Sequence, residues 1–231
     1  MESDRPFRHE LKYLMNRRDM DCCLGRITEF AKPDPHVKDG KYSVRSLYFD
    51  DIAKSAFIDK ESGVASRHKF RIRIYNMDES HISLEKKIKE GAYIRKESAM
   101  LSRIEYDMIM IGQSDFLLKR EEEAARDFAA EVRTKGLHPE VIVDYERIPF
   151  VSKAGDVRIT FDMNVRSVFD VLDVFSDKAP GYEVLMQDQL IMEVKYTQFL
   201  PQIFPALLPP EVAPTSASKY VMCMVKKGSI R

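Results

Sequence analysis

Lysine and arginine side chains recur at every second position in several short segments of the sequence. In the clearest case, Lys69-Phe-Arg-Ile-Arg-Ile-Tyr75, the cations Lys69, Arg71 and Arg73 alternate with apolar residues. Successive side chains of a β-strand point to opposite faces of the sheet, so these three cations share one face. The planar fork of Arg can hold two phosphate oxygens and Lys adds a point charge, so such a face is suited to a phosphate-bearing polyanion.

Five further segments show the same alternation, and most of their polar faces combine Lys or Arg with a carboxylate. The side chains on these faces are Arg8, Glu10 and Lys12; Glu85, Lys87 and Lys89; Tyr145 and Arg147; Arg158, Thr160 and Asp162; and Glu193 and Lys195. A single strand of this kind usually turns its polar face to water. The repetition over six strands instead favours a closed antiparallel barrel, with its apolar face outward against helices and its cations inside.

A cationic interior requires counter-charge, because each isolated buried charge is strongly destabilising. The carboxylates of the same faces supply part of it, and a bound polyanion would supply the rest. Glu10, Glu85 and Glu193 would repel phosphate unless a Mg²⁺ or Mn²⁺ ion lay between them, and hard divalent cations prefer such oxygen ligands. These three residues are therefore candidate metal ligands, and carboxylate–Lys pairs in a wet interior are the alternative.

Composition narrows the class of protein. The 231 residues include 37 Lys and Arg against 37 Asp and Glu, and a net charge of zero gives no general attraction to nucleic acids or membranes. We expect no nucleic-acid partner, because the cations lie on interior strand faces rather than on an exposed basic stripe. No apolar run is long enough to span a membrane, and the polar segment Met1 to Arg8 is not a secretory signal. Cys22, Cys23 and Cys223 are odd in number and indicate reduced thiols, so we expect a cytoplasmic protein without membrane insertion.

The pattern along the chain is rich in strands, with helical insertions. Neither a repeat nor a low-complexity linker interrupts it, so residues 1–231 are predicted to form one α+β domain. Strands are expected at 7–15, 42–49, 69–75, 82–89, 91–97, 140–150, 156–164 and 189–196. Helices are expected at 16–31, 50–60, 101–136 with a break near 112–114, 199–208 and 216–227, the second of them capped by Asp50 or Asp51.

Eight short motifs in this order resemble the catalytic domain of the vacuolar transporter chaperone (VTC) family. They are Arg8-His-Glu-Leu-Lys-Tyr13, Ser46-Leu-Tyr-Phe-Asp50, Lys69-Phe-Arg-Ile-Arg-Ile-Tyr75, Leu84-Glu-Lys-Lys87, Tyr145-Glu-Arg147, Arg158-Ile-Thr-Phe-Asp162, Met192-Glu-Val-Lys-Tyr196 and Ser218-Lys-Tyr220. That domain is the polyphosphate polymerase branch of the triphosphate tunnel metalloenzymes. The resemblance spans nearly the whole chain and implies an eight-stranded antiparallel tunnel β-barrel with peripheral helices.

The resemblance also implies roles for individual residues. The phosphate-binding cations would be Lys12, Arg71, Arg73, Lys87, Arg147, Arg158, Lys195 and Lys219. Tyr145 would donate a hydrogen bond to phosphate, and Glu193 would hold the metal. The chain departs from the pattern twice: Arg8 replaces the first Glu of a Glu-x-Glu-x-Lys signature, which favours the polymerase branch, and Ser216 stands where polymerases often have a second cation.

The function predicted from these residues is a metal-dependent phosphotransferase that moves the γ-phosphate of ATP onto inorganic polyphosphate. Arg71, Arg73, Lys87, Arg147 and Arg158 form the expected catalytic set, and Lys12, Lys69, Tyr145, Lys195 and Lys219 the expected substrate-binding set. The metal would be Mn²⁺ or Mg²⁺ at Glu193, with Glu10 and Glu85 as further ligands. Two alternatives remain at this point: a tripolyphosphatase or nucleoside triphosphatase, and a polyphosphate-binding sensor without catalysis. The expected small-molecule partners are ATP and inorganic polyphosphate, and the sequence does not identify partner proteins.

Overall fold

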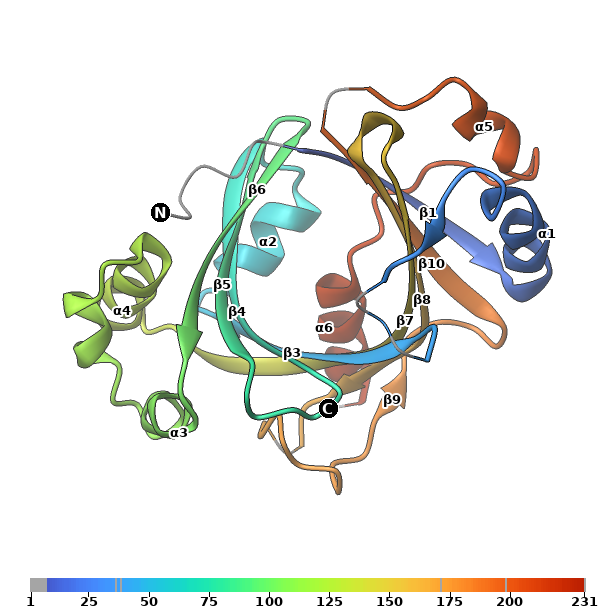
Figure 1. The fold of residues 1–231 in the computed structure, drawn as a ribbon. Helices are drawn as coiled ribbons and strands as arrows, with labels where there is room; N and C mark the ends of the chain where they lie inside the picture. The colour runs from blue at the N-terminus through green and yellow to red at the C-terminus, as the bar shows by residue number, and fades with distance from the viewer. Residues whose placement is uncertain (1–7, 36, 38, 171, 198, 231) are drawn as a thin grey trace.

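In the computed structural model, eight antiparallel strands close into a ring, which Figure 1 shows end-on. The structure describes residues 8–35, 37, 39–170, 172–197 and 199–230, so Phe7, the predicted start of the first strand, lies outside the described residues. The strands of the ring are β1 (Arg8–Asn16), β3 (Tyr42–Asp50), β4 (Ser66–Tyr75), β5 (Ile82–Glu90), β6 (Tyr93–Leu101), β7 (His138–Ser152), β8 (Val157–Val168) and β10 (Gln189–Tyr196). Their order is β7-β3-β4-β5-β6-β1-β10-β8, and the pairing of β8 with β7 closes the ring.

Two short strands and several helices lie between these elements. The two-residue strands β2 (Lys32–Pro33) and β9 (Tyr182–Glu183) pair with β7 and β8. The helices are α1 (Arg17–Ile27), α2 (Ser55–Glu61), α3 (Arg103–Met110), α4 (Glu123–Lys135), α5 (Ile203–Leu207) and α6 (Lys219–Ile230), with 3₁₀ turns η1 (Asp115–Lys119) and η2 (Ala154–Asp156). The predicted strands and helices are present, and the break near 112–114 separates α3 from η1. Within the described residues, none of the helices has the length and apolar character needed to cross a membrane.

Polar caps account for where several helices begin and end. The side chain of Asn16 accepts the Asp19 N–H at 2.8 Å at the start of α1. Ser102 and Glu105 form a reciprocal capping box at the start of α3. Gly136, at a φ of 68°, ends α4 in the left-handed conformation that glycine adopts without steric cost.

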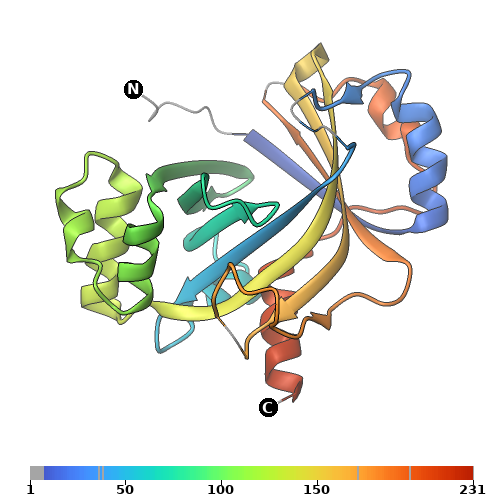
Figure 2. The same cartoon turned by 60° about the horizontal axis from the view of Figure 1, so that its bottom comes forward.

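The outward face of the ring is apolar and covered by helices, as the alternation predicts. On one side α3, η1 and α4 pack on β3 to β6, where Phe128 meets Phe49 and Phe70 edge to face. On the other side α1 and α5 pack on β1, β8 and β10 around the fully buried Ile27 and Phe204. Figures 1 and 2 show these two helical layers on opposite sides of the ring.

Helix α6 departs from the prediction that the helices lie outside. Its residues Tyr220, Val221 and Cys223 form an apolar cluster with side chains on the inward faces of β3 and β7, such as Val44 and Val143. Figure 1 shows α6 within the outline of the ring. The helix therefore fills part of the interior with apolar side chains and brings its first turn to the charged part.

Helix α2 is held to the ring by the two aspartates that were predicted to cap it. The carboxylate of Asp50 accepts the N–H groups of Ala56 and Phe57, and that of Asp51 accepts the N–H of Ser55. The helix begins at Ser55, later than predicted, because Lys54 adopts a left-handed φ of 59° just before it. These bonds fix α2 beside one end of the ring.

Candidate functional site

The interior side chains of β4 form the centre of the site. Lys69, Arg71 and Arg73 point inward, while Phe70 and Ile72 pack into the outer core at 1% and 0% exposure. Arg71 and Arg73 are themselves buried, at 9% and 8% exposure. The period of two predicted from the sequence therefore places three cations in a confined interior.

These three cations differ in their partners. Arg71 forms an ion pair with the buried Glu85, with Nε–Oε2 at 2.7 Å and Nη2–Oε2 at 2.6 Å. Arg73 instead donates to hydroxyl groups, Ser46 Oγ at 2.9 Å and Tyr145 Oη at 3.3 Å. Within the described part of the chain, no carboxylate lies within 4 Å of the charged groups of Arg73 or Lys69. The row therefore holds one buried cation, Arg73, and one half-buried cation, Lys69, that make no direct ion pair in the described residues.

Lys69 lies against aromatic rings rather than carboxylates. Its ammonium is 5.1 Å from the centre of the Tyr48 ring and 5.0 Å from that of Tyr220, and the two rings stack at 4.9 Å. The Tyr220 hydroxyl donates to Asp50 at 2.5 Å, which fixes the stack. The negative faces of aromatic rings attract a cation, but they leave its net charge in place.

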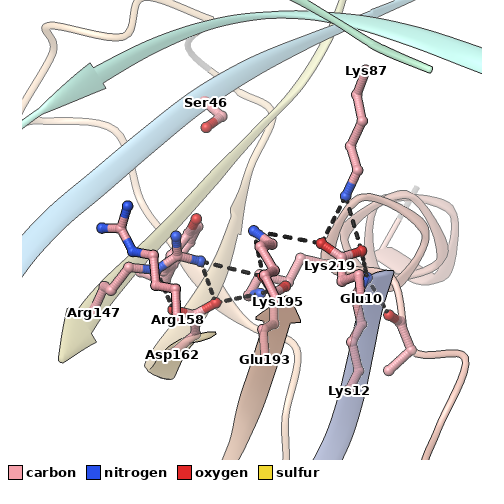
Figure 3. A network of polar contacts seen from close by, with 12 residues as sticks. Glu10, Lys12, Ser46, Lys87, Arg147, Arg158, Asp162, Glu193, Lys195 and Lys219 are labelled. Carbon is pink, nitrogen blue, oxygen red and sulfur yellow. Dashed lines mark hydrogen bonds and ion pairs between the residues drawn. The ribbon is translucent and has the colours of Figure 1, made fainter. Parts of the chain in front are cut away.

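A chain of alternating charges crosses the rest of the interior, as Figure 3 shows. Lys87 donates to both oxygens of Glu10 at 3.0 Å, and Lys195 lies between Glu10 (3.5 Å) and Glu193 (3.3 Å). Lys219 donates to Glu193 at 2.7 Å. The side chains in this part of the site come from β1, β5, β10 and α6, which are far apart in the sequence.

The same chain continues to a fully buried ion pair. Arg147 donates to both oxygens of Asp162, at 2.6 and 2.7 Å, and Lys219 contacts the same carboxylate. Asp162 is 0% exposed. Burial would raise the pKa of Asp162, but Arg147 and Lys219 lower it below its usual value, so the carboxylate stays ionised.

One cavity of about 50 Å³, here called the inner cavity, joins most of the predicted site residues. Its walls include Lys12, Lys69, Arg71, Arg73, Lys87, Tyr145, Arg147, Glu193, Lys195 and Lys219. These eight cations have four carboxylates within 4 Å in the described residues, namely Glu10, Glu85, Asp162 and Glu193. With all of these groups in their charged forms, the eight cations exceed the four carboxylates by four positive charges.

Arg158 lies apart from the other predicted cations. Its guanidinium is 3.2 Å from Asp34 and donates to the Tyr42 hydroxyl at 3.3 Å, and it is outside the residues that line the inner cavity. Its side chain is 41% exposed. A catalytic role for Arg158 stays a prediction, since the structure places it toward one end of the ring.

The candidate metal ligands do not converge on one point. Glu10 is paired with Lys87, Lys12 and Lys195, and Glu85 with Arg71 and Lys96. Glu193 is likewise paired with Lys195 and Lys219, but of the three candidates it alone lines the inner cavity. Mg²⁺ is commonly held by one or two carboxylates together with substrate phosphates and water. Glu193 fits such a one-carboxylate site, in which phosphate completes the set of ligands.

A group of three carboxylates elsewhere in the described residues lies close enough together to hold a cation. Glu97, Glu123 and Asp127 bring oxygens within 4.8 Å of one another outside the ring. Asp127 is already paired with Lys86 at 2.5 Å, and Glu97 with Arg95 at 2.9 Å. These pairs neutralise two of the three carboxylates, and the group belongs to the packing of α4 on the ring.

Several residues of the site were not predicted from the sequence. Tyr48, Ser218 and Tyr220 line the inner cavity, and Asp162 neutralises two of its cations. All four stand in the quoted motifs, Ser218 and Tyr220 directly beside the predicted Lys219, and Asp162 also lies on a charged strand face. The signal that could have found them is their position on an inward face.

Comparison with known proteins identifies the family. A family model described as the VTC domain matches residues 7–226. The chain belongs to the VTC domain family. The resemblance that the motifs predicted is therefore confirmed over nearly the full length. The search of curated proteins found no match to this VTC domain.

Solved structures share the fold of this VTC domain at low sequence identity. A candidate adenylate cyclase from Bacillus halodurans is 13% identical with a TM-score of 0.51, over 84% of this chain and 82% of its own. A candidate adenylyl cyclase from Hippeastrum, described as having a dominant triphosphatase activity, is 12% identical with a TM-score of 0.52, over 96% of both chains. The likeness confirms the predicted ring of eight antiparallel strands.

The charge of Lys69 predicts how phosphate affinity and protein stability depend on pH. Burial lowers the pKa of Lys69 to about 8, although Tyr48 opposes the shift. Affinity for tripolyphosphate is therefore expected to fall several-fold between pH 7 and 9 as the ammonium loses its proton. The stability of the unliganded protein should change in the opposite direction. The folded protein loses the Lys69 proton near pH 8, whereas the unfolded chain keeps it up to about pH 10.4, so the free energy of unfolding rises as pH increases from about 8 to 10.

A Lys69→Arg variant is the matched control, because arginine stays charged over this range. Isothermal titration calorimetry at pH 7, 8 and 9 would measure both affinities, and titration of the ligand itself would affect both proteins equally. An equal fall in affinity for the variant and the parent protein would contradict the prediction.

Proposed function

We propose that this VTC domain binds inorganic polyphosphate in the inner cavity and lengthens it with the γ-phosphate of ATP. The observation that supports the proposal is the excess of positive charge, with the buried Arg73 and the half-buried Lys69 more than 4 Å from any carboxylate in the described residues. A buried cation without a counter-ion is costly. A phosphate chain would supply the missing negative charge along the row of β4.

The residues of the chain would then act by positioning and by neutralising charge. Arg71, Arg73 and Arg147 present guanidinium groups to the cavity, and each can hold phosphate oxygens in a fixed orientation. Phosphoryl transfer depends mainly on such positioning and electrostatic stabilisation. An ionised terminal oxygen of the polyphosphate would attack the γ-phosphorus, and ADP would leave as the bond between the β- and γ-phosphates breaks. The attacking oxygen carries no proton to remove near neutral pH, so the reaction needs no Ser-His-Asp set.

Glu193 is the residue that would hold a divalent cation. Burial would raise the pKa of Glu193, but Lys219 and Lys195 keep it well below its usual value, so the carboxylate is ionised and able to bind Mn²⁺ or Mg²⁺. The cation, when bound, would neutralise charge on the oxygens of the β- and γ-phosphates. Lys195 contacts one oxygen of the Glu193 carboxylate and Lys219 the other, and the two contacts fix its orientation.

Incubation with ATP and either Mn²⁺ or Mg²⁺, followed by separation of the products on a gel, tests the proposed function. A ladder of polyphosphate that grows with time is expected. Release of free phosphate alone would instead indicate a triphosphatase. An unchanged ATP pool together with tight binding of polyphosphate would indicate a sensor, and either result would overturn the proposal.

A Glu193→Gln variant separates catalysis from binding. Turnover is expected to fall by about 100-fold or more, because the variant loses the ionised metal ligand. Affinity for tripolyphosphate should be retained or rise a few-fold, since Lys195 and Lys219 lose a competing carboxylate. Product gels and calorimetry measure the two quantities, and Glu79→Gln on the exposed turn after β4 is the control. Undiminished turnover in Glu193→Gln would contradict this role.

A further inference from the structure

Tyr48 lines the inner cavity from β3 and is paired across the sheet with Arg71 on β4. The residue is 5% exposed. Its hydroxyl oxygen accepts a hydrogen bond from Nη1 of Arg71 at 2.8 Å, and within the described residues the hydroxyl proton has no acceptor. A buried tyrosine hydroxyl usually has a partner for its proton, so this one is placed either to donate to a ligand or to lose the proton.

The neighbouring ring of Tyr220 is in the opposite situation. The two rings stack at 4.9 Å, but the Tyr220 hydroxyl donates to the carboxylate of Asp50. Burial, and then Asp50, raise the pKa of Tyr220 above its usual value. Tyr220 therefore keeps its proton and supports the ring of Tyr48, and the two hydroxyl groups of one stack face charges of opposite sign.

Cations face Tyr48 from β4. Arg71 bonds to its oxygen, Lys69 Nζ lies 5.1 Å from the centre of its ring, and Arg73 is the next inward side chain of the strand. On the other side, its cross-strand partner on β7 is the apolar Val141. Burial would raise the pKa of Tyr48, but Arg71, then Lys69 and Arg73, lower it to about 7.

We propose that Tyr48 binds phosphate as a hydrogen-bond donor and takes up a proton from solvent when the ligand enters the inner cavity. In the unliganded protein its phenolate oxygen serves as a counter-ion to Arg71 and Lys69. Phosphate oxygens that reach these two cations replace the phenolate in this role and repel its negative charge. The phenolate oxygen then gains a proton, and the new hydroxyl donates a hydrogen bond to phosphate. This inference rests on the proposed binding of phosphate in the inner cavity.

The ultraviolet absorbance of phenolate tests the proposal, because the chain has ten tyrosines and no tryptophan whose absorbance would overlap. Without ligand, one tyrosine of the parent protein should titrate near pH 7. The variant Tyr48→Phe keeps the stacked ring and should lack this step. Saturating tripolyphosphate should raise the midpoint in the parent protein by about one pH unit or more.

Tyr75→Phe is the matched control for this titration. Burial would raise the pKa of Tyr75, but Arg73 is the first of the cations that lower it below its usual value. Tyr75 is therefore a second tyrosine whose ionisation is favoured by the cations of β4. The variant Tyr75→Phe should keep the step near pH 7 that Tyr48→Phe loses.

Calorimetry gives a second measure, in which both proteins carry Lys69→Arg so that the Lys69 ammonium does not contribute. At pH 6, adding Tyr48→Phe should weaken tripolyphosphate binding about tenfold, because the donor is lost. At pH 9 the difference should be less than about twofold, since Tyr48 is then ionised and must take up a proton before it can donate. A purely structural role for Tyr48 predicts the same loss at both pH values, and that result would overturn the inference.

Three spectroscopic results would also overturn it: no phenolate step near pH 7 in the parent protein, a step that persists in Tyr48→Phe, or a midpoint that tripolyphosphate leaves unchanged although calorimetry detects binding. The shift of the midpoint in the parent protein needs no variant, so it tests the proposal even if Tyr48→Phe is unstable. If the parent protein does not bind tripolyphosphate, the proposed function fails and the inference fails with it. The titration without ligand distinguishes the two cases, because it reports the ionisation of Tyr48 alone.

Discussion

Replacing Arg73 by Met is expected to weaken tripolyphosphate binding by about 10- to 100-fold while leaving the protein at least as stable as the parent. Arg73 is 8% exposed, and its guanidinium bonds only to the hydroxyl groups of Ser46 and Tyr145 in the described residues. A hydrogen bond from a charged group to phosphate contributes about 1.5–3 kcal/mol, which sets the expected loss. An apolar side chain of similar length removes a buried charge that makes no direct ion pair in the described residues, so the fold does not lose stability.

Arg71 provides the matched comparison, because it occupies the next inward position on the same strand. Its partner Glu85 is 1% exposed, and Arg71→Met leaves this carboxylate with Lys96 as its remaining ion-pair partner in the described residues. The free energy of unfolding should fall by about 3–5 kcal/mol, and the double variant Arg71→Met, Glu85→Gln should recover much of it. Urea unfolding and calorimetry measure stability and affinity. If Arg73→Met were as destabilising as Arg71→Met, the unbalanced charge assigned to Arg73 would be wrong.

The alternation of side chains was sufficient to predict which face of each strand lies inside. Lys69, Arg71 and Arg73 point inward because a strand has a period of two and Phe70 and Ile72 need an apolar outer layer. The same rule predicts a ring once enough strands have one charged face, since a closed ring provides an enclosed interior.

The pairing of charges across the ring could not be predicted in the same way. Glu10 and Lys87 are 77 residues apart and meet because β6 lies between β5 and β1 in the ring. Strand order depends on the packing of the whole chain rather than on local spacing. The sequence therefore indicated carboxylate–Lys pairs as one of two alternatives for Glu10, and the structure shows that such pairs form.

The alternation of side chains also does not show how far along the axis of the ring each residue lies. Arg158 and Asp162 lie on the same face of β8, but four residues separate them, or about 13 Å along a strand. Asp162 consequently lies in the interior, and Arg158 reaches Asp34 on the segment after β2. The inward position of α6 was missed for a related reason, because an apolar stripe on a helix does not indicate which side of a sheet it covers.

Asp162→Asn is expected to lower the free energy of unfolding by about 3–5 kcal/mol at pH 7. Asp162 is fully buried, accepts two hydrogen bonds from Arg147 and contacts Lys219, so the neutral amide leaves two buried cations with Glu193 as their remaining carboxylate. Urea unfolding at pH 7 measures the loss. Tripolyphosphate should stabilise the variant more than the parent protein, because its phosphates replace the missing negative charge.

The pH dependence of this loss separates charge from packing. Arg147 and Lys219 overcome the effect of burial and hold the pKa of Asp162 below its usual value. A carboxyl group with a lowered pKa in the folded state contributes its stability above its unfolded pKa of about 3.9, and that contribution disappears as pH falls through the folded value. The difference between Asp162→Asn and the parent protein should therefore be constant from pH 7 to 5 and shrink below about pH 4. A difference that stayed the same down to pH 3 would mean that the amide disturbs packing, and that the ion pair with Arg147 contributes little.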